Sequence, residues 1–105
     1  MTLYHATKAR NVASIMRHGL LVKRADSAAK IKGVWLHTKA MTPWAILHTQ
    51  RKHKASLEQV VILEVKVRRE ALRRFRRGLW YVSVDIKPSA LRAHSVGVDH
   101  SRSVS

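Results

Sequence analysis

The stretch from Val60 to Val67 reads VVILEVKV, and it decides the fold that the rest of the chain can build. Every second side chain from Val61 onward is apolar, while the intervening positions turn polar at Glu64 and Lys66. Successive side chains of a strand point to opposite faces, so one face of this strand is wholly apolar. This pattern is typical of a central strand that is covered on both sides, and we expect a sheet around it.

Shorter strand-like segments lie on both sides of this strand in the sequence. They are residues 3–5 (LYH), 33–38 (GVWLHT) and 79–86 (LWYVSVDI). Pro88 follows the last segment and ends it, because proline cannot donate to a ladder of hydrogen bonds. Residues 90–96 fit either a final turn or an edge strand, and both interpretations stay open.

Apolar residues at helical spacing predict two helices in the first half of the chain. The first runs from about Arg10 to His18 and ends at Gly19, and residues 22–32 after it predict a basic loop. The second begins at Thr42-Pro43, a typical start signal for a helix. Helices gathered in one half of the chain favour an α+β fold over a doubly wound sheet. At 105 residues the chain suits a single domain, predicted over 1–97, with a flexible tail over 98–105.

Charge is the strongest property of the whole chain. Lysine and arginine number 21 against six acidic residues, a formal net charge of +15. Self-repulsion at this level costs stability, so the composition favours a polyanionic partner, and a nucleic acid (RNA or DNA) is the first expectation. An anionic membrane surface fits less well, because the basic residues are not gathered on one long amphipathic helix. A basic surface that serves only solubility stays the alternative.

One basic run, RREALRRFRRG over 68–78, predicts a contact surface for a nucleic-acid backbone. We interpret Arg68 to Phe75 as a short helix with Leu72 and Phe75 facing inward. The arginines then expected on one face are Arg69, Arg73, Arg76 and Arg77. The alternative is a solvated face whose arginine stems cover apolar surface.

Several kinds of site are not indicated. The seven histidines form no HxxxH or HExxH pattern, and cysteine is absent, so no metal site is predicted. Absence of cysteine also excludes disulfides and thiol nucleophiles. No apolar run is long enough to cross a bilayer and the N-terminus has no secretory pattern, so we expect a cytoplasmic protein.

The order of several segments resembles the ADP-ribosyltransferase fold. The segments are LYHAT (3–7), NVASIMRHGL (11–20), GVWLHT (33–38), PWAILH (43–48), VVILEVKV (60–67) and GLWYVSVDIKPSAL (78–91). GVWLHT is also similar to part of the NAD-dependent RNA 2′-phosphotransferases of this superfamily. The resemblance implies two small antiparallel sheets around a central cleft, with NAD as the cofactor consumed there.

The resemblance also implies roles for individual residues. His5 matches a histidine that hydrogen-bonds the ribose and amide of NAD, and Ala6 and Thr7 belong to the same opening motif. Trp35 matches an aromatic residue that stacks on nicotinamide, with Thr38 closing that strand. Judged by itself, a lone tryptophan on a strand favours a core position over a stacking role.

The chain departs from the family pattern in its late strand, where Trp80 occupies the place of a catalytic acid. An acceptor that is already anionic, such as an RNA 2′-phosphate, needs cationic positioning more than a general base. Candidates for that positioning are Arg24, His37 and His48. The prediction is therefore an NAD-dependent transferase acting on nucleic acid. Two alternatives stay open: a catalytically silent nucleic-acid-binding module on the same fold, and a basic protein of unrelated α+β fold.

Overall fold

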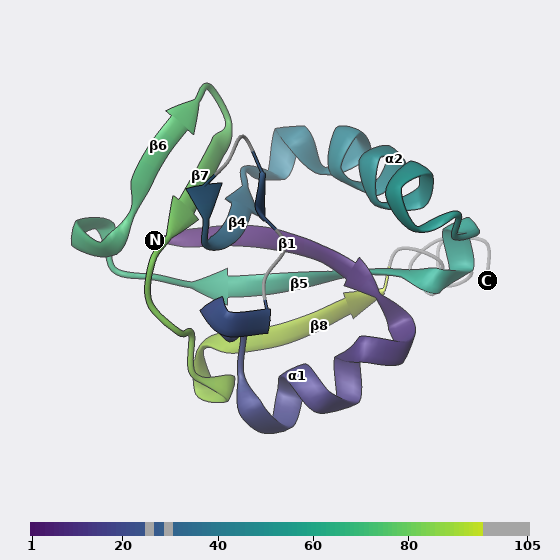
Figure 1. Cartoon of the computed structure of the whole chain (residues 1–105), viewed down its shortest axis with the longest axis horizontal. Helices are drawn as coiled ribbons and strands as arrows, with labels where there is room; N and C mark the ends of the chain where they lie inside the picture. The colour runs from purple at the N-terminus through teal and green to yellow at the C-terminus, as the bar shows by residue number, and fades with distance from the viewer. Residues whose placement is uncertain (25–26, 29–30, 96–105) are drawn as a thin grey trace, which may run out of the picture.

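The computed structural model describes residues 1–24, 27–28 and 31–95, and it is α+β as predicted (Figure 1). The described helices are α1 (Val12–His18) and α2 (Thr42–His53). The long strands are β1 (Thr2–Lys8), β5 (Val60–Lys66) and β8 (Leu91–Ser95). The shorter strands are β2 (Ser27–Ala28), β3 (Ile31–Lys32), β4 (Val34–His37), β6 (Arg73–Arg76) and β7 (Leu79–Val82). The part of the chain predicted to be a tail lies outside the described residues.

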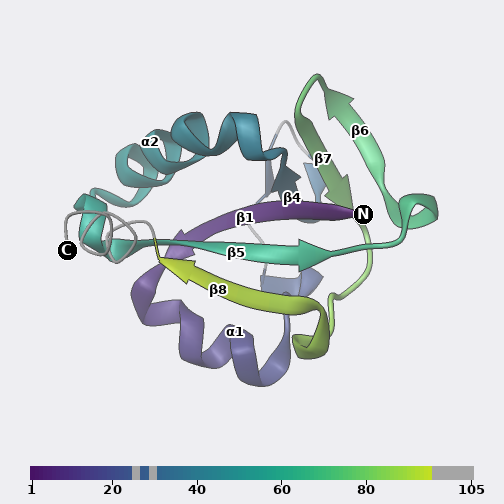
Figure 2. The same cartoon turned by 180° about the vertical axis from the view of Figure 1, so that it is seen from behind.

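The predicted central strand, β5, lies inside the main sheet between β1 and β8. Leu63 and Val65 belong to a buried cluster against which Ile15 and Met16 of α1 pack. Ile62 points to the opposite face, where α2 contacts β1 and β5. Figures 1 and 2 show α1 and α2 on opposite sides of these three strands. Burial on both faces explains why this stretch is almost continuously apolar.

The main sheet opens between β1 and β4. Its described strands run in the order β6-β7-β4-β1-β5-β8, and all neighbours are antiparallel. β1 and β5 pair from Thr2↔Lys66 to Lys8↔Val60, whereas β1 and β4 share the single pair Tyr4↔His37. In Figure 1, β4, β7 and β6 run steeply across the direction of β1, β5 and β8. The two separate sheets predicted from the resemblance are not confirmed, since these six described strands form one sheet.

The predicted helix over 68–75 is wrong. Residues Arg69–Ala71 form a single 3-10 turn (η5), and the following residues form strand β6, which pairs with β7. Gly78 provides the turn with a φ of 80°, a conformation that glycine adopts without strain. Leu72 is buried as expected, but Phe75 is 38% exposed. The arginine run has only two large apolar side chains, Leu72 and Phe75, which are too few to bury one face of a helix. In the hairpin, its backbone groups pair with β7 instead.

The late strand is shorter than predicted, because β7 ends at Val82. Val84 is exposed instead of sharing a buried face, and Ile86 forms an isolated bridge with Leu20. Asp85 accepts a hydrogen bond of 2.8 Å from the backbone N–H of Val22, which fixes the chain after α1. Of the two interpretations left open for residues 90–96, the edge strand is the one observed over Leu91–Ser95. A turn at Pro88–Ala90 leads into this strand, β8, which pairs with β5.

Gly19 ends α1 as predicted, with a φ of 87°. A Cβ atom at this position would collide with the backbone carbonyl of Ile86. The close approach allows the backbone bonds between Leu20 and Ile86, which tie the end of α1 to the sheet. The predicted loop over 22–32 contains a 3-10 turn at Val22–Arg24 (η2) and the short β2–β3 pair.

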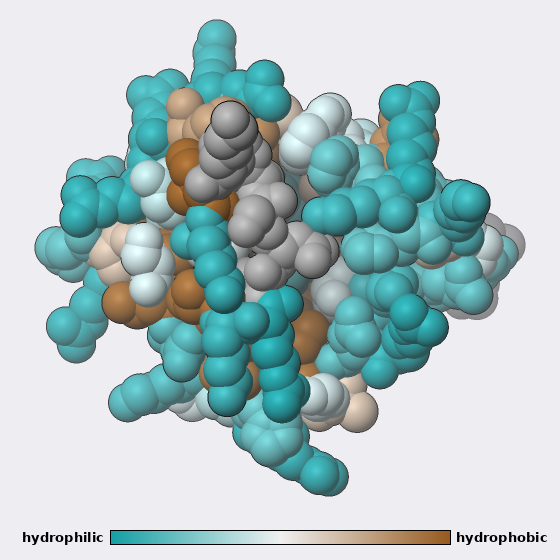
Figure 3. All heavy atoms as spheres, viewed as in Figure 1, coloured by the Kyte–Doolittle hydropathy of each residue, from teal (hydrophilic) through white to brown (hydrophobic). Residues whose placement is uncertain are grey.

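Hydrophilic side chains cover much of the face seen in Figure 3, with smaller hydrophobic areas between them. Among the described residues, neither helix combines the length and the apolar character needed to cross a bilayer.

Candidate functional site

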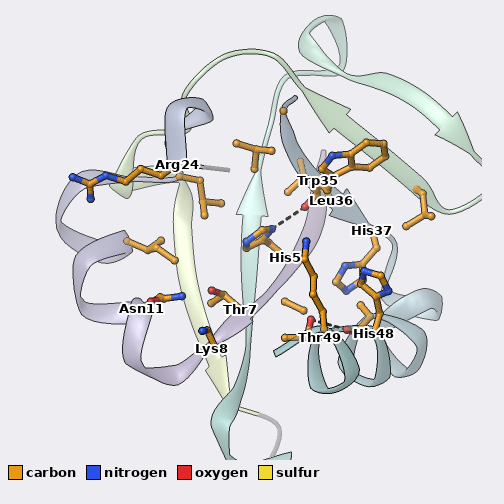
Figure 4. Close-up of a pocket in the computed structure, with 18 of the residues that line it drawn as sticks. His5, Thr7, Lys8, Asn11, Arg24, Trp35, Leu36, His37, His48 and Thr49 are labelled. Carbon is orange, nitrogen blue, oxygen red and sulfur yellow. Dashed lines mark hydrogen bonds between the residues drawn. The ribbon is translucent and has the colours of Figure 1, made fainter. Parts of the chain in front are cut away.

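A cavity of about 580 Å³ lies at the opening between β1 and β4 and extends from α1 to α2. This volume is within the range of small-molecule and cofactor sites. The strands supply His5, Ala6, Thr7, Trp35, His37 and Arg76 to its wall, and other elements supply Arg24 and His48. Figure 4 shows His5 and Thr7 between Arg24 and Asn11 on one side and Trp35, His37 and His48 on the other. Eight of the residues selected from the sequence, which are far apart in the chain, line this one cavity.

Four predicted site residues do not line this cavity: Thr38, Arg69, Arg73 and Arg77. Thr38 directly follows β4 and donates its backbone N–H to the carbonyl oxygen of Gly78, so it holds the turn between β6 and β7. The arginines do not share a helical face, because β6 is a strand in which neighbouring side chains alternate. Of the four arginines predicted in the basic run, Arg76 alone is among the described residues that line the cavity.

The His5 side chain links β1 to β4 beside the single residue pair that these strands share. Its Nδ1 lies 2.8 Å from the carbonyl oxygen of Trp35, shown by the dashed line in Figure 4. A carbonyl oxygen only accepts, so Nδ1 carries the proton and donates, which makes Nε2 an acceptor in the neutral ring. The bond therefore fixes the tautomer of His5 and the position of the Trp35 backbone.

The Trp35 ring is held by other aromatic rings. Phe75 of β6 meets the Trp35 ring edge-on, with 5.1 Å between ring centroids. Tyr81 of β7 is the cross-strand partner of Trp35, and its ring centroid lies 5.2 Å away. Such edge-to-face and tilted contacts are favoured arrangements of aromatic pairs. Trp35 Nε1 is buried and has no hydrogen-bond partner among the described residues. Trp35 is thus both a packed residue and a wall residue, so the two interpretations of GVWLHT are compatible.

His37 is a buried titratable group with a strongly lowered pKa. It is 3% exposed, and its Nε2 finds no hydrogen-bond partner within the described part of the chain. Burial, and secondarily the charge of His5, lowers the pKa of His37 from 6.5 to about 4. At neutral pH the His37 ring is therefore uncharged, which suits hydrogen bonding to a ligand better than neutralising a phosphate.

One aromatic residue of the wall, Trp44, was not among the site residues selected from the sequence. Trp44 and His48 of α2 stack with centroids 5.0 Å apart and an interplanar angle of 13°. Their spacing of four residues places them on one helical face, which is the signal that a search for aromatic pairs would have found. Phe75 was expected to face inward but lines the cavity, with the Arg76 guanidinium 5.3 Å from its ring.

The described wall of the cavity is strongly basic. Its lysines and arginines are Lys8, Arg24, Lys52 and Arg76, and its histidines are His5, His37, His48 and His53. No aspartate or glutamate is found among the described lining residues. Such a concentration of donors and positive charge in a concave, partly apolar site favours an anionic ligand with aromatic parts.

Trp80, which the resemblance places at the position of a catalytic acid, does not line the cavity. Its ring packs against the hydrophobic core, and the Arg74 guanidinium lies 5.8 Å from the ring centroid. The described residues also contain no cluster of three or more histidine, aspartate or glutamate side chains that could hold a metal ion.

Comparison with models of known protein families finds no match to this chain, and comparison with curated protein sequences finds none either.

Proposed function

We propose that the chain is an NAD-dependent transferase of ADP-ribosyltransferase type that acts on a phosphate group of a nucleic acid. The observation that carries the proposal is the cavity itself, where His5, Thr7 and Trp35 lie together on one wall. These are the residues that the resemblance assigns to NAD. An RNA 2′-phosphate is the acceptor that the proposal favours.

The chemistry of the wall fits NAD. The ligand has two aromatic groups, and the wall offers Trp35 with Phe75 in contact. It has a diphosphate, and Lys8, Arg24 and Arg76 supply positive charge. The buried, unpartnered Trp35 Nε1 and His37 Nε2 are explained if a polar ligand completes their hydrogen bonds.

His5 would contact the ribose beside nicotinamide, held in position by its bond to the Trp35 carbonyl. In the transfer step, the bond between the ribose C1″ carbon and the nicotinamide nitrogen breaks. Nicotinamide leaves with the electron pair and becomes neutral, and a phosphate oxygen of the acceptor forms the new bond to C1″. No proton has to leave the phosphate, so the step needs positioning by cations and not a general base.

The test is release of nicotinamide from NAD in the presence of two matched RNA oligonucleotides, one with an internal 2′-phosphate and one without. We expect release with the phosphorylated RNA and little with the other, because an unmodified hydroxyl requires a base to remove its proton. Equal release with both would contradict the choice of acceptor. No release with either, in a protein that binds RNA, would contradict the enzyme.

The second candidate is a catalytically silent module that binds nucleic acid through the same basic wall. It is favoured by the absence of carboxylates among the described lining residues. The nicotinamide assay separates the two candidates, since the silent module would bind the phosphorylated RNA without releasing nicotinamide. Binding in that case is expected to fall steeply with salt.

A further inference from the structure

We propose that the Trp44–His48 stack on α2 is a platform for one base of a single-stranded nucleic acid, distinct from the Trp35 wall. The inference deepens the proposed function, because it names how the acceptor strand is held. It does not depend on NAD turnover, since it concerns a binding event that the protein would make without NAD.

The geometry of the pair suits a base. The rings are stacked and nearly parallel, at 13°, so His48 covers one face of the Trp44 ring and a base can continue the stack on the other face. Trp44 is 41% exposed and yet lines the cavity. A large aromatic residue at such a position is open to a ligand on one side, and base–aromatic stacking is a common basis of single-strand binding.

Charge continues along the same face of the helix. Trp44, His48 and Lys52 are each four residues apart, and all three line the cavity. Lys52 therefore stands about 12 Å along α2 from the tryptophan, at 1.5 Å per residue. The last turn of α2 is basic throughout, at Arg51, Lys52 and His53. An aromatic surface followed by cations is the arrangement that a stacked base and its attached phosphate backbone require.

The exposed neighbours distinguish this face from an ordinary helix surface. Leu47 is also exposed, at 46%, but it does not line the cavity. The stack is on the α2 side of the opening, whereas Trp35 belongs to β4 and contacts Phe75 of β6. One cavity thus has two separate aromatic positions, enough for nicotinamide at one and a base of the acceptor at the other.

The platform favours a single strand over a duplex, because it needs a base with an exposed face. A base within a duplex has both faces covered by its neighbours, whereas an unpaired base offers a face for stacking. The surplus of 15 positive charges attracts the phosphates of either form, so charge supplies affinity and the stack supplies the preference for the unpaired form.

The experiment measures binding of a fluorescein-labelled single-stranded RNA of about eight nucleotides, without NAD, by anisotropy. Trp44→Ala is compared with Trp44→Phe, which keeps an aromatic face, and with Leu47→Ala as the matched control on the same helix. We expect Kd to rise roughly 5- to 150-fold in Trp44→Ala, to recover largely in Trp44→Phe, and to stay unchanged in Leu47→Ala. The salt dependence of Kd is expected to keep its slope in Trp44→Ala, because the substitution removes no charge.

Thermal melting of each variant confirms that it is folded before Kd is compared. The proposal is overturned if Trp44→Ala binds the single strand as the unchanged protein does, or if wild type binds a duplex of the same sequence equally well. It is also overturned if Trp44→Ala weakens binding of NAD and leaves RNA binding intact, because the platform would then hold the adenine of NAD. If the unchanged protein releases no nicotinamide but the Kd values for RNA change as expected, the proposed transferase activity is rejected and the base-stacking platform stands.

Discussion

Replacing His5 with alanine is expected to lower the rate of nicotinamide release by about a hundredfold or more, in line with the loss of one preorganised polar contact in an active site. The His5 ring lines the cavity and is oriented by its 2.8 Å bond to the Trp35 carbonyl. Under the proposed function, its removal takes away both a contact to the ribose and the side chain that positions the Trp35 backbone. The measurement is single-turnover release of nicotinamide with saturating phosphorylated RNA.

The matched variant is His5→Asn, whose side-chain N–H₂ can replace Nδ1–H as donor to the Trp35 carbonyl while Nε2 is lost. If the ring acts on NAD, His5→Asn is as slow as His5→Ala although its melting temperature matches that of the unchanged protein. Activity retained in His5→Asn would reduce His5 to a structural residue. Activity retained in both variants would remove it from the mechanism altogether.

The second large effect concerns His37 and the stability of the fold in acid. Burial holds the pKa of this histidine near 4, whereas an unfolded histidine titrates near 6.5. The unfolded chain therefore binds one more proton than the folded chain between these values, so stability is complete above pH 6.5 and falls as pH drops towards 4. The difference in pKa corresponds to about 3 kcal/mol of unfolding free energy.

Urea unfolding at a series of pH values measures this effect. His37→Phe, which cannot take up a proton, is expected to lose this part of the pH dependence while the rest of the acid sensitivity remains. His18→Gln is the matched control, because it removes an exposed histidine of α1 and leaves the buried one in place. If His37→Phe and wild type fall equally between pH 6.5 and 4, the buried histidine does not couple folding to pH.

The sequence predicts the framework well where one pattern has one physical solution. VVILEVKV becomes β5 because an apolar segment of that length is stable only when both its faces are covered. α1 ends at Gly19 because the chain needs a positive φ and close approach to Ile86 there. The run after Arg68 is different, since its helix and hairpin solutions differ in long-range pairing with β7, which local spacing does not contain.

The candidate site follows the same division. His5 and Trp35 could be selected from their strands and from the family resemblance, and they do meet at the opening between β1 and β4. Phe75 and Arg76 reach the cavity through the β6–β7 hairpin. Because a helix was predicted over 68–75, the position of these two residues could not be predicted either. The lowered pKa of His37 depends on burial by distant residues, and no local pattern reports that.

The central claim is that this cavity binds NAD against Trp35, and isothermal titration calorimetry at low salt tests it most directly. The account predicts that NAD binds the unchanged protein, that binding is lost in Trp35→Ala, and that Trp35→Phe, which keeps an aromatic face, retains part of it. Melting curves show whether each variant is folded. No binding of NAD to the unchanged protein, or equal affinity in folded Trp35→Ala, would contradict the account.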